Sequence, residues 1–170
     1  MAPPTLTDAP VHIRSESPDQ PAVRALLQAL DDYLATLYEP EHNHILGLQA
    51  LRAPDICFLV ARRHGQVVGC GAFRRHAGEP ATGGEVYGEI KRMMVDPAAR
   101  GQGIGAALLE QVEREARAQG ARALSLTTAT NNPARRLYER AGFRVTETRT
   151  DPEFEAATGV AGRVLMVKAL

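Results

Sequence analysis

The chain has 170 residues, of which 44% are hydrophobic and 24% charged, and 20 lysines and arginines balance 20 aspartates and glutamates. A net charge of zero gives no electrostatic reason to expect nucleic acid or an anionic membrane as a partner. No apolar run reaches the length of about 18 residues that a membrane span needs, and the N-terminus lacks the basic and apolar regions of a signal peptide, so we expect a cytoplasmic protein.

The length suits one domain, and we expect residues 1–170 to form a single domain in which the proline-rich residues 1–9 are flexible. A short strand is predicted over 11–14. From residue 22 onward, apolar side chains recur at helical spacing until Pro40, which predicts a first helix. A second, shorter helix is predicted over 45–51.

Two apolar runs, 56–61 and 67–73, flank His64 and Gly65 and predict a β-hairpin. With the turn at these two residues, 57 faces 72 and 59 faces 70. Cys57 and Cys70 are then diagonal neighbours on one face of the sheet rather than a facing pair. We expect two buried thiols in a reducing compartment, not a disulfide.

The rest of the chain alternates strands and helices. Helices are predicted over 103–119, ending at Gly120, and over 131–141, beginning with an asparagine cap and Pro133. Strands are predicted over four ranges: 86–95, 124–127, 143–148 and 164–167. The order β-α-α-β-β-β-α-β-α-β-β indicates a mixed α/β fold.

A glycine-rich segment, residues 100–106, joins the predicted strand 86–95 to the helix that follows it. The first turn of a helix has N–H groups without an intrahelical partner, and the helix dipole favours an anion there. Glycines at 101, 103 and 105 leave this backbone accessible, and Arg100 adds a positive charge. The segment therefore predicts a site for a phosphorylated ligand.

Three phosphate-binding motifs compete for this segment. The P-loop string does not occur. Gly101, Gly103 and Ala106 match the dinucleotide fingerprint literally, but five residues including Pro97 separate them from the strand. No acidic residue follows within 121–130, which disfavours a dinucleotide-dependent oxidoreductase. The third motif, R/Q-x-x-G-x-G/A, is matched by R-G-Q-G-I-G from Arg100.

Two further segments flank this motif: E-I-K-R-M-M-V-D-P from Glu89 and N-N-P-A-R-R-L-Y-E-R-A-G-F from Asn131. The order of the three segments resembles the GNAT superfamily of N-acetyltransferases, in particular its bacterial small-molecule members. The resemblance covers residues 87–143. It implies an α/β GNAT acyl-CoA N-acyltransferase fold, a mixed, mostly antiparallel, bent sheet with helices on both faces. It also implies splayed fourth and fifth strands around the pantetheine arm of acetyl-CoA, with CoA as the product.

The resemblance also implies which residues hold this cofactor. The pyrophosphate is assigned to the glycine-rich segment: Arg100, Gly101, Gln102, Gly103, Ile104, Gly105 and Ala106. The main chain of Met93, Met94 and Val95 is assigned to pantetheine and to the acetyl oxygen. Asn131 or Asn132 is expected to bond pantetheine, although a helix N-cap explains one of them equally well.

Acetyl transfer to an amine needs a base for the ammonium proton and a proton donor for the leaving thiolate. The resemblance assigns these roles to Glu89 and Tyr138. Glu89 is alternatively a solvent-facing charge paired with an arginine, and Tyr138 a packed core residue. Because a sensor needs neither residue, an N-acetyltransferase is favoured over the alternative, a non-catalytic acyl-CoA-binding sensor domain.

The acceptor is expected to be a primary amine of a small molecule, amino acid or peptide, attacking directly. Tyr87 shares a strand face with Glu89 and is a candidate wall of the acceptor site. Tyr38 and His44, in the loop Y-E-P-E-H-N-H, are further candidates, with a plain surface loop as the alternative.

No metal site is expected there, because histidines at i, i+2 share no helix face and no third ligand is evident. The positive residues Arg74, Arg75, Lys91 and Arg92 favour an acceptor that carries a carboxylate, unless they face solvent. A homodimer is possible, since dimers are common in the family that the chain resembles.

Overall fold

The computed structural model describes residues 9–36, 45–78, 80, 83–130, 132–149, 156 and 162–170. Within them the strands form one sheet in the order β1-β2-β3-β4-β5-β7-β6. The strands are β1 (His12–Ser15), β2 (Ile56–Arg63), β3 (Gln66–His76), β4 (Tyr87–Val95), β5 (Ala123–Ala129), β6 (Arg144–Arg149) and β7 (Arg163–Ala169). The helices are α1 (Pro21–Ala35), α2 (Ile104–Ala118) and α3 (Arg135–Arg140), with 3₁₀ turns η2 (Ala50–Arg52) and η4 (Pro97–Ala99).

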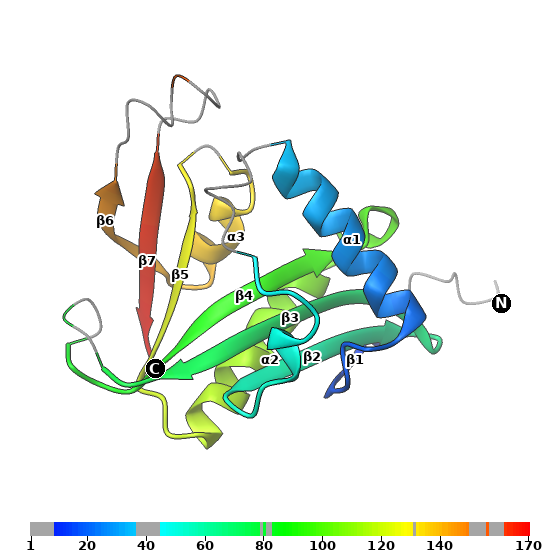
Figure 1. Ribbon diagram of the computed structural model, residues 1–170, viewed down its shortest axis with the longest axis horizontal. Helices are drawn as coiled ribbons and strands as arrows, with labels where there is room; N and C mark the ends of the chain where they lie inside the picture. The colour runs from blue at the N-terminus through cyan, green and yellow to red at the C-terminus, as the bar shows by residue number, and fades with distance from the viewer. Residues whose placement is uncertain are drawn as a thin grey trace, which may run out of the picture.

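The sheet is mixed, because β4 and β5 are parallel while every other pair of neighbouring strands is antiparallel. Helix α1 covers one face, and α2 and α3 pack on the other (Figure 1). The predicted mixed, mostly antiparallel sheet with helices on both faces is therefore confirmed. None of the described helices is both long and apolar enough to cross a membrane.

Two hydrophobic cores lie on the two faces of the sheet. The apolar stripe of α1, which includes Val23 and Leu27, packs on side chains of β2, β3 and β4. The stripe of α2, which includes Leu108 and Val112, packs on the other face together with Tyr138 of α3. Each helix is held to the sheet by this one buried stripe, as its helical spacing predicts.

The strands β4 and β5 pair only briefly. Their ladder runs from Tyr87 opposite Ala123 to Glu89 opposite Ser125 and then ends. Figure 1 shows the two strands diverging from that point, so β5, β7 and β6 lean away from the rest of the sheet. The predicted splay of the fourth and fifth strands is confirmed.

A β-bulge interrupts β4 just beyond the end of this ladder. Arg92 has a φ of 56°, and the pairing with β3 shifts so that Arg92 and Met93 both stand opposite Gly71. The extra residue reverses the alternation of side chains. Met94 consequently packs into the α1 core while Met93 packs against the α2 core.

The predicted helix over 45–51 is wrong. Residues 45–47 have no regular structure, and only η2 forms. Gly47 inside the window lowers helix stability by about 1 kcal/mol, and Pro54 disfavours a helical Ala53. One turn of 3₁₀-helix is what remains.

The hairpin turn lies at His64 and Gly65 as predicted, with φ of 50° and 76°. Its predicted register holds next to the turn, but a bulge between Ala61 and Arg62 shifts the pairing by one residue in the rest of the hairpin. Cys57 belongs to the α2 core and Cys70 to the α1 core. The two free, buried thiols therefore lie on opposite faces, and the prediction of diagonal neighbours is wrong.

The last helix, α3, begins later than the predicted 131. The Asn132 side chain accepts a hydrogen bond from the Ala134 N–H at 3.0 Å and donates one to Thr128 Oγ1 at 2.9 Å. This local turn competes with helix formation, so α3 has six residues, from Arg135 to Arg140. Tyr138 still lies within it.

Candidate functional site

A cleft with a volume of about 1630 Å³ opens where β4 and β5 part. Its walls come from α1, β4, the glycine turn, β5, α3 and β7. The parting of the two strands therefore brings together residues that are far apart in the chain.

The glycine turn closes one end of the cleft. Gly101 and Gly103 adopt φ of 74° and 78°, a conformation that favours glycine. Gly103 is the N-cap of α2, and it has no side chain that could accept from the first-turn N–H groups. A Cβ on Gly105 would lie 2.9 Å from Leu137 Cδ2, so glycine permits close packing of α2 on α3. The turn offers a helix N-terminus to an anion.

Of the two long side chains in the turn, Arg100 lines the cleft and Gln102 does not. Arg100 lines the cleft and fastens the turn to the end of β4, with its Nε donating to the Val95 carbonyl at 3.2 Å and its Nη2 3.7 Å from Met94 Sδ. Gln102 is exposed, bonds Arg63 and does not line the cleft. Gly101, Gly103, Ile104, Gly105 and Ala106 all line it.

Met93, Met94 and Val95 also line the cleft. The β4–β5 ladder ends at Glu89, so from Ile90 onward β4 has no pairing partner on β5 among the described residues. That stretch of main chain faces the opening. An extended ligand arm lying there would find strand N–H and C=O groups to bond.

Glu89 lies at the last rung of the ladder and lines the cleft, with 26% of its side chain exposed. Its Oε1 is 3.0 Å from His76 Nε2, and its Oε2 is 3.1 Å from Lys91 Nζ. Arg74 stands directly opposite on β3 but pairs with Asp55, at 3.1 Å. The carboxylate is thus held by a histidine and a lysine rather than by an arginine.

Tyr87 lies two residues before Glu89, is buried and lines the cleft. His76, its cross-strand neighbour, stacks on its ring with centroids 5.0 Å apart and planes 17° apart. Stacking and hydrogen bonding fix the imidazole in one orientation beside Glu89.

Tyr138 reaches the cleft from α3 and is 8% exposed. Burial raises the pKa of its phenol to about 12, so the hydroxyl keeps its proton at any physiological pH. Its ring meets Phe143 edge-on, with centroids 5.9 Å apart. Tyr138 is therefore packed in the core and also lines the cleft.

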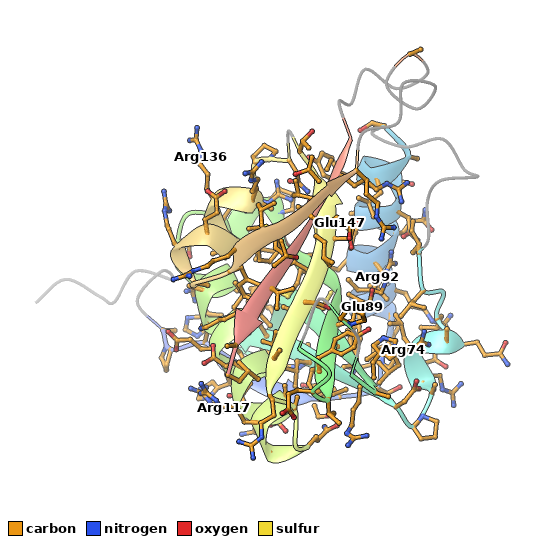
Figure 2. The ribbon with its side chains drawn as sticks, turned by 90° about the vertical axis from the view of Figure 1, so that its left-hand side faces the viewer. Arg74, Glu89, Arg92, Arg117, Arg136 and Glu147 are labelled. Carbon is orange, nitrogen blue, oxygen red and sulfur yellow. The ribbon has the colours of Figure 1, made fainter. Side chains whose placement is uncertain are left out.

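Of the four cations proposed near the acceptor, two line the cleft. Lys91 does so beside Glu89, and Arg92 does so with 5% of its side chain exposed, bound to Asp31 and, at 3.4 Å, to the Leu27 carbonyl. Arg74 and Arg75 do not line it, and Arg75 Nε donates to the Gln119 carbonyl at 3.1 Å. Figure 2 shows Arg92 and Glu89 close together on the α1 side, with Arg117 and Arg136 across the molecule.

Three predicted site residues, Asn131, Tyr38 and His44, lie outside the described residues. Asn132 does line the cleft, but its side chain is used in the turn before α3. Within the described part of the chain, no group of three His, Cys, Asp or Glu side chains is placed to hold a metal ion.

Sequence reasoning missed cleft residues on β5, α1 and β7. Ser125 is buried and lies opposite Glu89, and a small polar residue between Leu124 and Leu126 was its only signal. Tyr33 of α1 and Leu165 of β7 also line the cleft. Nothing in their local sequence marks them, because the splay brings them there.

The chain is similar in sequence to known acetyltransferases. The model of the acetyltransferase (GNAT) family matches residues 23–143. A protein of Azospirillum brasilense named IAA acetyltransferase is 55% identical over 85 residues, 50% of this chain and 52% of that protein, so the match spans about half of this relative's length. The N-acetyltransferase YsnE of Bacillus subtilis (strain 168), named uncharacterized, is 32% identical over 119 residues, 66% of this chain and 72% of that one.

Among solved structures, a GNAT family acetyltransferase from Elizabethkingia anophelis with acetyl-CoA bound superposes with a TM-score of 0.64. It is 20% identical, and the match covers 94% of this chain and 98% of that chain. At this identity the likeness shows the fold, which is the predicted one.

Proposed function

Because the chain belongs to the GNAT family of acetyltransferases, we propose that it transfers the acetyl group of acetyl-CoA to a primary amine of a small molecule, amino acid or peptide. The observation that carries this proposal is one cleft lined by the glycine turn, Glu89 and Tyr138. They supply, respectively, amides for a phosphate, an acceptor for a proton and a donor of a proton.

The residues of the cleft fit acetyl-CoA, which when bound supplies an acetyl thioester with a thiolate leaving group. The first-turn amides of α2 hold the pyrophosphate, and Arg100 keeps that turn fastened to β4. The open main chain of Met93, Met94 and Val95 bonds the pantetheine arm, and an N–H of this stretch polarises the acetyl carbonyl. Asn131 remains a proposed pantetheine contact.

Glu89 is the proposed base. An aliphatic amine with a pKa of about 10.4 is almost entirely protonated at pH 7 and cannot attack until a proton is removed. The Glu89 carboxylate faces the cleft and is held by His76 and Lys91, so it lies ready to accept that proton.

Tyr138 is the proposed donor to the departing sulfur. Its pKa of about 12 keeps the phenol neutral, which a donor requires. Full transfer from such a weak acid to a thiolate with a pKa of about 8.5 is uphill. Tyr138 therefore acts chiefly by hydrogen bonding to the sulfur as it gains charge.

The acceptor side of the cleft combines apolar and positive groups. Leu30, Tyr33 and Leu34 of α1 line it, together with Lys91 and Arg92. Tyr87 adds an aromatic wall, and Tyr38 and His44 remain proposed contributors. This lining favours an acceptor that carries both an apolar part and a carboxylate near its amine.

An amine panel tests the proposed function. Purified protein is given acetyl-CoA and pairs of primary amines that differ only in a carboxylate. Peptides with a free N-terminus are added to the panel, and so is IAA, because the Azospirillum relative is named an IAA acetyltransferase. Release of free CoA is measured. We expect turnover with carboxylate-bearing amines and a loss of that preference in Lys91→Met. Acetyl-CoA binding without turnover on any amine would contradict the proposal and favour a sensor.

A further inference from the structure

The imidazole of His76 is placed unusually well for a residue that does not line the cleft. It lies at the end of β3, stacked on Tyr87, with Nε2 3.0 Å from Glu89 Oε1. Its side chain is 31% exposed. Glu89 therefore stands between the cleft and a histidine that can exchange protons with water.

We propose that His76 is a positioning residue whose charge state sets the strength of Glu89 as a base. The inference rests on the proposed role of Glu89 in acetyl transfer. His76 touches neither the cleft nor a reacting atom, so it acts only through the carboxylate.

The first part of the role is geometric. His76 and Lys91 each hold one carboxylate oxygen of Glu89, at 3.0 and 3.1 Å. Two donors on two different oxygens restrict the carboxylate to one orientation. Each oxygen keeps a lone pair for the acceptor amine, since a carboxylate offers about four acceptor sites.

The second part is electrostatic. A neutral imidazole donates an ordinary hydrogen bond to the carboxylate. An imidazolium places a full positive charge in the same position and stabilises the carboxylate anion, which then accepts a proton less readily. Glu89 is therefore the stronger base when His76 is neutral.

The other charged groups around His76 are engaged elsewhere. On its own strand, Arg74 pairs with Asp55, and Arg75 donates to the Gln119 carbonyl. From β4, Lys91 bonds the other oxygen of Glu89, and Tyr87 contributes its ring face. Glu89 is thus the carboxylate that His76 contacts, at 3.0 Å.

Two substitutions separate the geometric and electrostatic parts. His76→Gln keeps an N–H donor but cannot take up a second proton, while His76→Phe keeps a ring on Tyr87 but has no donor. The ratio of kcat/KM between variant and wild type is measured from pH 5.5 to 8 with one amine, so that titration of the amine cancels. His12→Gln, an exposed histidine on β1, is the matched control.

As the pH falls, a histidine takes up a second proton, which Gln cannot do. The ratio for His76→Gln should therefore rise between pH 8 and 5.5, while that for His12→Gln stays flat. His76→Phe should lower kcat/KM about tenfold at pH 8, with acetyl-CoA affinity unchanged. A flat ratio for His76→Gln, or full activity of His76→Phe at pH 8, would overturn the role of His76.

A second measurement does not need turnover. The titration midpoint of the His76 ring, followed by NMR, should fall in Glu89→Gln, because the neutral amide no longer stabilises the imidazolium. An unchanged midpoint would overturn the coupling between the two groups. Absence of turnover with every amine would instead overturn the proposed function, so the two failures are distinguishable.

Discussion

The proposed role of Glu89 depends on a single position on β4. It occupies the last rung of the β4–β5 ladder, so its side chain emerges where the sheet opens. Period-two alternation predicts that Glu89 shares a face with Tyr87, and it does. Its partners His76 and Lys91 could be named only once the register of β3 against β4 was known.

The first prediction concerns Glu89→Gln. At pH 7 the variant should lose roughly 100-fold in kcat/KM, because nothing removes the ammonium proton. Toward pH 9 the loss should shrink, because about 100 times more of an amine with a pKa of about 10.4 is then neutral in solution. The measurement is kcat/KM against pH, with Glu139→Gln, an exposed glutamate on α3, as the control. Wild-type activity of Glu89→Gln at pH 7 would make Glu89 an ion-paired strand residue only.

The second prediction concerns Tyr138→Phe. The substitution removes the hydroxyl but keeps the edge contact with Phe143, so folding and acetyl-CoA affinity should be unchanged. Turnover should fall by about 100-fold, without recovery at high pH.

The raised pKa of Tyr138 also determines how activity should depend on pH. The neutral phenol is the proposed donor, and with a pKa of about 12 it persists well above pH 10. Wild-type activity should therefore not decline between pH 8 and 10 through this group. A descending limb near pH 10 that disappears in Tyr138→Phe would contradict the assignment.

Among the helices and strands, the spacing of apolar residues predicted best those helices that pack through a single buried stripe. The helix predicted over 103–119 is α2, Ile104–Ala118, followed by Gly120 in the left-handed conformation. The stripe of α2 packs on one face of the sheet, so helical spacing alone identifies the buried face.

Predictions failed where a local backbone event intervened. One extra residue in the hairpin moved Cys57 and Cys70 to opposite faces, and the Asn132 turn shortened α3. The bulge at Arg92, which decides where Met93 and Met94 point, has no signal in residue type. Such features depend on tertiary packing, which an apolar pattern does not encode.

The glycine turn carries the third prediction. Gly103 and Gly120 cap the two ends of α2 with φ of 78° and 84°, and a Cβ on either would meet no atom within 4 Å. Alanine at either position should cost about 1 kcal/mol through backbone strain alone. Only Gly103→Ala should also weaken acetyl-CoA binding, at least tenfold by calorimetry, because the strain disturbs the amides that are proposed to bind the phosphate. Equal affinities in both variants would place the phosphate elsewhere.

At the scale of the whole molecule, β4 and β5 part within the sheet, but one hydrophobic core spans both halves. Beyond three ladder pairs, β4 and β5 separate, yet the α2 core joins Phe73 and Ile90 of one half to Leu126 and Met166 of the other. The cleft is therefore an opening between strands whose two halves share one hydrophobic core with α2. We predict that residues 1–170 unfold as a single unit.

This arrangement gives the fourth prediction. A ligand that fills the opening binds only the folded chain, so acetyl-CoA at 100 times its Kd should stabilise the protein by about 2.7 kcal/mol. For a chain of this size, Tm should rise by roughly 5–11 °C. Gly103→Ala should show a smaller rise at the same acetyl-CoA concentration, whereas Gly120→Ala should show the wild-type rise. A Tm that does not respond to acetyl-CoA would mean that the cleft does not hold it.

The most direct test of the account is the stoichiometry of the reaction at pH 7, with the best amine from the panel. Acetylated amine is quantified by mass spectrometry and free CoA by thiol titration, in the same samples over time. The two products should appear at equal rates, and Glu89→Gln should slow both together. Release of CoA without acetylated amine would contradict it, because the cleft would then deliver the acetyl group to water.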